Sequence, residues 1–94
     1  MITKEQALNL KHGQVIKQVR TYGPDYIVKH DSNMRMYKHY LNETVLAKPI
    51  NWRVNGSIKT WKTRPDEFKL PIKHGLYNYG YIDHTNNHLF ELVE

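Results

Sequence analysis

Apolar and polar residues alternate most clearly in the second half of the chain. Phe68, Leu70 and Ile72 take one set of positions, and Lys69, Pro71 and Lys73 take the other. A period of two residues predicts a β-strand with one buried and one solvated face. Because proline has no N–H to donate, we expect this strand to lack a hydrogen-bonding partner on one side at Pro71.

A second alternation follows the break at Gly75. Its two sets of residues are Tyr77, Tyr79 and Tyr81 on one side, and Leu76, Asn78, Gly80 and Ile82 on the other. This pattern predicts a further strand with an aromatic face.

Asn55-Gly56 lies between two runs of β-branched and aromatic residues, which favours a tight hairpin because the turn needs positive φ. Two registers stay open. A two-residue turn places Trp61 on the face of Val54, whereas a three-residue turn places Ile58 there and directs Trp61 outward.

The chain opens with residues that favour a short helix over 3–12. Thr3 is suited to the N-cap, Gln6 is placed to complete a capping box, and Gly13 is placed to end the helix. A helix of this length is unstable alone, so we expect its apolar side to pack on the sheet.

The remaining strands are expected at 14–22, 26–30, 50–54 and 89–93. Residues 34–47 fit two patterns, a helical stripe and a strand alternation, and we favour an extended arm or hairpin. The residues that carry these patterns are Tyr37, Tyr40 and Leu41 for a helix, and Met34, Met36 and Tyr40 for a strand.

One helix and five or six short strands in 94 residues predict a single, mainly β domain shaped as a small half-open barrel. The chain has no cysteine, which excludes disulfides and thiolate metal sites and fits a reducing compartment. It has no apolar run of membrane-spanning length, and its first residues do not resemble a signal peptide. We therefore expect a cytoplasmic protein.

Positive charge is concentrated in one region. The chain has a net charge of +5, and residues 52–74 hold six Lys or Arg against two acidic residues, whereas residues 83–94 hold no Lys or Arg. This asymmetry indicates a polyanion partner or a neighbouring subunit of opposite charge. The alternative is a basic face that is simply solvated.

Three segments carry a distinctive combination of residues: Arg53-Val54-Asn55-Gly56, residues 59–65 (KTWKTRP) and residues 68–77 (FKLPIKHGLY). They resemble a family of small proteins from marine phage, of cyanophage origin, and from ocean metagenomes. The opening over 3–13 is similar too, so the resemblance covers about half of the chain. Residues 23–49 are atypical of the family and are interpreted as an insertion or extended arm.

The resemblance implies an Sm-like fold, in which an N-terminal helix lies on a strongly bent, five-stranded SH3-like barrel and subunits form a homo-oligomeric ring. Sm-like proteins bind RNA with loops at the central pore. By analogy, Asn55 and Gly56 fill one loop, and Lys73, His74 and Gly75 fill another. The chain departs from the family pattern because no aromatic residue precedes Asn55, and Lys-His-Gly replaces an Arg-Gly pair.

The three tyrosines are a candidate platform for stacking unpaired bases beside Lys69 and Lys73. The alternative, which the residue types favour, is that these rings pack on the core or on the next subunit. The complete candidate set for nucleic-acid binding is Asn55, Gly56, Lys69, Lys73, His74, Gly75 and Tyr79.

No pattern indicates catalysis, a cofactor or a small-molecule substrate, and we expect the protein not to be an enzyme. His84 and His88 have a spacing that two metal ligands on a helix would share, but no suitable third ligand accompanies them. The serines Ser32 and Ser57 lie in expected turns with no partner for nucleophilic catalysis.

Two functions remain from the sequence. The first is a ring that binds RNA or single-stranded nucleic acid through its basic loops. The second is a structural or assembly ring of a phage particle or phage–host complex that binds no nucleic acid. Binding that weakens steeply with salt would favour the first.

Overall fold

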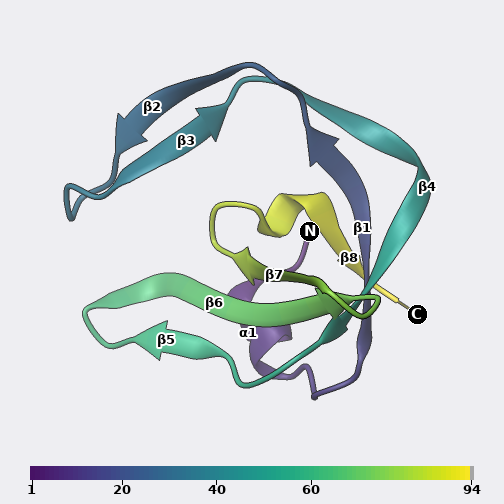
Figure 1. Ribbon diagram of the computed structural model, residues 1–94. Helices are drawn as coiled ribbons and strands as arrows, with labels where there is room; N and C mark the ends of the chain where they lie inside the picture. Colours follow the sequence, from purple (N-terminus) through teal and green to yellow (C-terminus); the bar gives the residue numbers. More distant parts are fainter. Residues whose placement is uncertain (94) are drawn as a thin grey trace.

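The computed structural model describes residues 1–93, and strands make up most of this part of the chain (Figure 1). The elements are α1 (Lys4–Leu8), β1 (Val15–Tyr22), β2 (Tyr26–His30), β3 (Met36–Tyr40), β4 (Glu43–Val54), β5 (Lys59–Trp61), β6 (Arg64–His74), β7 (Asn78–Asp83), the 3-10 turn η1 (Asn87–Leu89) and β8 (Phe90–Leu92). The mainly β class expected from the sequence is confirmed.

Six strands form the main sheet, in the order β5-β6-β4-β1-β8, and β7 also pairs with β6. β2 and β3 form a separate two-stranded ribbon. The sheets are not closed in the part of the chain that the structure describes, so a barrel is not shown. The described residues form eight strands, so the expected five or six were too few; β3 pairs with the expected strand at 26–30, and the chain between β4 and β6 forms the short β5.

The hydrophobic core joins α1 to the inner face of β6 and its neighbours. The predicted alternation along β6 is confirmed, since Phe68, Leu70 and Ile72 are buried while the residues between them are partly exposed. The buried set is Ile2, Ala7, Ile16, Val54, Phe68, Leu70, Ile72, Ile82, Leu89 and Phe90. Burial of β6 on this face fixes which of its side chains point the other way.

The N-terminal helix is shorter than the expected 3–12. Thr3 and Gln6 form the predicted capping box, but the helix ends at Leu8. Leu10 leaves the helix axis and packs against the core. Gly13, expected to end the helix, has a φ of 85° in the next turn, where its N–H donates to the Val54 carbonyl oxygen at 2.7 Å.

The expected hairpin at Asn55-Gly56 was wrong in both registers. β4 and β5 do not pair with each other, because each pairs with β6. The Asn55 N–H donates to the Pro71 carbonyl oxygen at 2.9 Å, which draws the turn onto β6 instead. The Trp61 side chain is half-buried, and the Arg64 guanidinium lies 4.7 Å from its ring centre.

Residues 23–42 form an arm that arches over the rest of the molecule (Figure 1). The arm holds the β2–β3 ribbon, and its two ends continue into β1 and β4. The extended interpretation of residues 34–47 is therefore confirmed over 36–40. Residues 43–49 belong to β4, where residues 43–45 pair with β1.

Phe68 and Trp61 differ sharply in burial, which generates a stability prediction. Phe68→Ala removes a ring that is 2% exposed, and we expect a loss of about 3–5 kcal/mol in the free energy of unfolding. Trp61→Ala removes a larger ring that lies outside the core, so we expect a clearly smaller loss. Urea denaturation of both variants provides the measurement, and equal losses would contradict this assignment of the core.

Candidate nucleic-acid interface

The face of β6 opposite the core carries Glu67, Lys69, Pro71 and Lys73. Strand pairing places other side chains beside these residues. Lys73 lies opposite Arg53 of β4 and Tyr79 of β7. Lys69 lies opposite Lys59 of β5 and Asp83 of β7. We call this surface the basic-aromatic face; its residues are Arg53, Lys59, Lys69, Lys73, Tyr79 and Tyr81.

Two pairs of like charges lie on this face. Arg53 lies directly opposite Lys73, and Lys59 lies directly opposite Lys69. Like charges at opposed positions of a sheet destabilise the pairing. Within residues 1–93, none of these four side chains forms an ion pair with a carboxylate. Asp83 lies opposite Lys69 in the β6–β7 register without forming an ion pair with it, and the Arg53 guanidinium donates to the Gly13 carbonyl oxygen at 3.0 Å.

The tyrosines on this face are exposed. Tyr79 is 64% exposed and Tyr81 is 47% exposed. The Lys69 ammonium lies 4.1 Å from the Tyr81 ring centre, and the Lys73 ammonium lies 5.6 Å from the Tyr79 ring centre. Packing of these rings on the chain's own core, which the residue types favoured, was therefore wrong; packing on a neighbouring subunit stays a prediction.

The Asn55-Gly56 turn borders the basic-aromatic face beside Pro71. A Cβ atom at Gly56 would lie 2.9 Å from the Pro71 Cγ atom, and Gly56 has a φ of 134°. Both facts require glycine at this position. The turn therefore lies against β6 between the positions of Lys69 and Lys73.

His74 belongs to the opposite face of the sheet. Its ring lies 5.5 Å from the Trp52 ring, and its Nδ1 atom is 3.1 Å from the Asn51 carbonyl oxygen. Gly75 supplies a φ of 65° in the turn that leads to β7. The candidate set is thus split, with five members around Pro71 and with His74 and Gly75 at the end of the face or behind it.

Arg53, Lys59 and Tyr81 belong to the face but were not among the candidates. Arg53 and Lys59 could not be placed on this face from the sequence, because the register of β4 and β5 against β6 was not known. Tyr81 was visible in the alternating tyrosines, and its place opposite Pro71 follows from the β6–β7 pairing.

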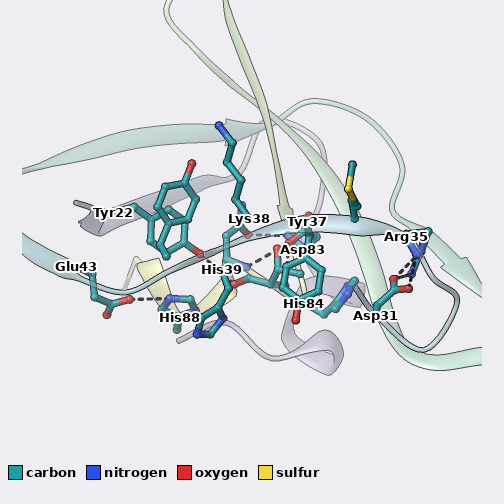
Figure 2. A pocket seen from close by; sticks show the side chains of 14 residues that line it. Tyr22, Asp31, Arg35, Tyr37, Lys38, His39, Glu43, Asp83, His84 and His88 are labelled. Carbon is teal, nitrogen blue, oxygen red and sulfur yellow. Dashed lines mark hydrogen bonds and ion pairs between the residues drawn. The ribbon is translucent and has the colours of Figure 1, made fainter. Parts of the chain in front are cut away.

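A cleft of about 790 Å³ lies between the arm and the turn that follows β7. Its lining includes Tyr37 and His39 of β3, and Asp83, His84 and His88 on the other wall. Figure 2 shows Tyr37 and His39 directed toward the side of the cleft that carries the other two histidines, whereas Lys38 points the opposite way. No sequence pattern indicated this cleft, because its walls are far apart in the chain.

Glu67 connects the tip of the arm to the body. Its carboxylate forms an ion pair with Arg35 of the arm, and it also contacts Arg64 at 3.2 Å and His84 at 3.3 Å. Hydrogen bonds to Glu67 and Asp31 raise the pKa of the Arg35 guanidinium. The Arg35 backbone N–H, followed by the Arg35 side chain, lowers the pKa of Asp31. One carboxylate on β6 therefore holds the arm tip in place.

A second contact joins the base of the arm to the body. Tyr22 stacks on Tyr40 with ring centres 4.2 Å apart, and its hydroxyl donates to the Thr85 carbonyl oxygen at 3.0 Å. Burial, and then the nearby Asp83 and Glu43 carboxylates, raise the pKa of Tyr22 to about 12. The hydroxyl thus stays a neutral donor at physiological pH.

His84 and His88 do not converge on one point, because they face different carboxylates. His88 Nε2 lies 2.8 Å from Glu43, whereas His84 contacts Glu67. Across residues 1–93, no three His, Asp or Glu side chains are placed to hold a metal ion together. No helix in the same part of the chain is long and apolar enough to span a membrane.

The Glu67 cluster predicts that the arm can be released selectively. Glu67→Gln keeps the size of the side chain but removes the charge that holds Arg35, so we expect trypsin to cleave after Lys29 and Lys38 several-fold faster. Cleavage in the body, after Lys17, should keep its rate. Asp66→Asn is the matched control, because Asp66 is exposed and forms no ion pair in the described residues. Equal cleavage of the two variants would contradict the anchoring role.

Comparison with known proteins finds no matching family model, no matching curated protein and no matching solved structure. The resemblance of short segments to an Sm-like family of marine phage therefore stays a prediction. The functional inference rests on the chemistry of the basic-aromatic face.

Proposed function

We propose that the basic-aromatic face binds single-stranded nucleic acid, with RNA as the preferred ligand. The observation that carries the proposal is the two pairs of opposed like charges, Arg53 with Lys73 and Lys59 with Lys69, whose side chains form no ion pair in the described residues. A phosphate between the two members of a pair converts their repulsion into two attractive contacts. Each such contact also releases counterions from the nucleic acid.

The exposed tyrosines supply the second part of the interaction. Tyr79 and Tyr81 lie on β7, directly beside the β6 lysines, so phosphates and bases can be held on adjacent strands. Aromatic rings stack with any base, at about 1–3 kcal/mol per base, and this stacking does not depend strongly on sequence. Duplexes hide their bases from such a surface, which favours single strands.

Asn55 supplies a means of base discrimination. It lies at the edge of the face beside Pro71, and its side-chain amide offers both a donor and acceptors to a base edge. Gly56 leaves the neighbouring main chain accessible because it has no side chain.

The proposal includes a homo-oligomeric ring, in keeping with the Sm-like resemblance and a cytoplasmic setting. In the described residues, β7 pairs only with β6 and β8 pairs only with β1, so each offers an unpaired edge. Pairing β7 of one subunit with β8 of the next is a head-to-tail contact, which generates a ring when the rotation between subunits closes. A ring repeats each weak nucleic-acid site, so affinity sums over the subunits.

Lys73→Glu should weaken binding of short single-stranded RNA by about tenfold or more, and should reduce the slope of log affinity against log salt by about one unit. Fluorescence anisotropy with poly-U and poly-A probes across a salt series measures both effects. Lys48→Glu is the matched control, since it makes the same charge change on β4 away from β6.

Asn55→Ala should reduce the difference in affinity between the poly-U and poly-A probes more than it reduces the affinity for either probe. If the wild-type protein binds neither probe at low salt, the proposal fails and the assembly ring without nucleic acid takes its place.

Light scattering should give a mass of at least three chains of 11.2 kDa at micromolar concentration. A head-to-tail contact passes from each subunit to the next and so builds a ring of several chains, whereas a symmetric contact joins only two. A mass of one chain would contradict every oligomeric form of the proposal. A mass of two chains would contradict the ring alone.

A further inference from the structure

The outer edge of the arm is an unpaired β-strand edge. β2 pairs only with β3 in the described residues, and all five of its residues are exposed. No β2 residue lines the cleft, whereas β3 lines it along its whole length, so the free edge of β2 faces away from the body. Tyr26, Ile27 and Val28 are 45%, 44% and 57% exposed.

Such an edge needs a partner for two reasons. An isolated two-stranded ribbon is at best marginally stable in water, and three or more strands are usually needed. An exposed, apolar edge strand is also a template for pairing with another chain. β2 carries only one Lys, at position 29, and no proline to block such pairing.

The hydrogen bonds of the ribbon show which backbone groups are free. The Asp31 N–H donates to the Arg35 carbonyl oxygen at 3.1 Å, and the Leu41 N–H donates to the Asp25 carbonyl oxygen at 3.0 Å. Because hydrogen-bonded pairs alternate along an antiparallel ladder, residues 27 and 29 bond to β3. Tyr26, Val28 and His30 therefore direct their N–H and C=O groups outward.

We propose that β2 pairs with β2 of a second copy of this chain, antiparallel, about a two-fold axis at Ile27. In this register Ile27 faces its own counterpart, Tyr26 faces Val28 of the second copy, and Asp25 faces Lys29 of the second copy. The outward N–H and C=O groups of Tyr26 in one copy then form hydrogen bonds with those of Val28 in the other. The two ribbons form one sheet in the order β3-β2-β2-β3.

Charge selects this register over its neighbours. An antiparallel pair joins residues of the same hydrogen-bonding type, so the two-fold axis passes through a residue. An axis at Val28 would place Lys29 opposite Ile27, without a carboxylate partner, and an axis at Lys29 would place two lysines opposite each other. Like charges at opposed positions are destabilising, whereas the Ile27 axis gives two Asp–Lys pairs.

The same reasoning excludes β3 as the self-pairing edge. Its outward backbone groups belong to Met36, Lys38 and Tyr40. All of β3 lines the cleft and no residue of β2 does, so the body lies next to β3. A two-fold axis at its central residue would also oppose two copies of Lys38. β2 is free of both obstacles, and its self-complementary charges favour a second copy over an unrelated peptide.

Cysteine cross-linking tests the register, because the chain has no cysteine of its own. Ile27 lies on the axis at a non-hydrogen-bonded position, where opposed Cα atoms are about 4.5 Å apart, within the range of a disulfide. Ile27→Cys should therefore oxidise to a covalent dimer, seen on a non-reducing denaturing gel. Lys29→Cys is the matched control. In the proposed register the two copies of residue 29 are four residues apart along the strand, about 13 Å, which is too far for a disulfide.

Charge reversal gives a second measurement that does not depend on a disulfide. Lys29→Asp opposes two aspartates and should lower the mass by light scattering, and the double variant Asp25→Lys with Lys29→Asp should restore it. The proposal would be overturned if neither Ile27→Cys nor Lys29→Cys formed a cross-linked dimer, or if both did so equally. It would also be overturned if the double variant did not recover the wild-type mass by light scattering. Preferential cross-linking of Val28→Cys would overturn the Ile27 axis. These measurements contain no RNA, so their failure leaves the nucleic-acid proposal standing.

Discussion

The alternation along β6 is the constraint on which the other features depend. Burial of Phe68, Leu70 and Ile72 leaves only one orientation for the strand, because a slip of one residue would bury Lys69 and Lys73. Burying two unpaired ammonium groups costs far more than the core could offset. The same burial therefore holds the core together and presents the charges on the outer face.

Pro71 at the middle of β6 links that strand to the turn before β5. Proline removes a donor but keeps its carbonyl group, and the Asn55 N–H bonds to that carbonyl oxygen. The ring of Pro71 also occupies the space that a side chain at position 56 would need. Pro71, which in the sequence indicated a strand without a partner on one side, is thus the point where the turn between β4 and β5 is attached to β6.

Local patterns were enough to predict much of this fold. The strands at 15–22, 26–30 and 68–73 follow directly from alternation and β-branched residues, and the capping box of Thr3 and Gln6 follows from its spacing. Lys69 and Lys73 were identified because they lie on the last of these strands, and Tyr79 because it lies in the alternating tyrosines of β7.

Features that depend on contacts between distant residues could not be predicted in this way. The place of Arg53 beside Lys73 depends on pairing across 20 residues, and the cleft depends on a contact between Arg35 and Glu67, 32 residues apart. The hairpin at Asn55-Gly56 was wrong for a related reason: the turn residues are suitable, but β6 competes for both neighbouring strands. Local preference yields where a longer-range ladder buries more apolar surface.

The attachment of the arm has a consequence for how the molecule unfolds. Its contacts with the body are ion pairs, hydrogen bonds and one stacked ring pair, and it contributes no side chain to the buried core. We therefore expect the arm to open at a lower free energy than the core. Changes in the length or sequence of residues 26–40 are then tolerated by the rest of the domain. A change in the arm can therefore alter the surface that the arm presents without altering the core.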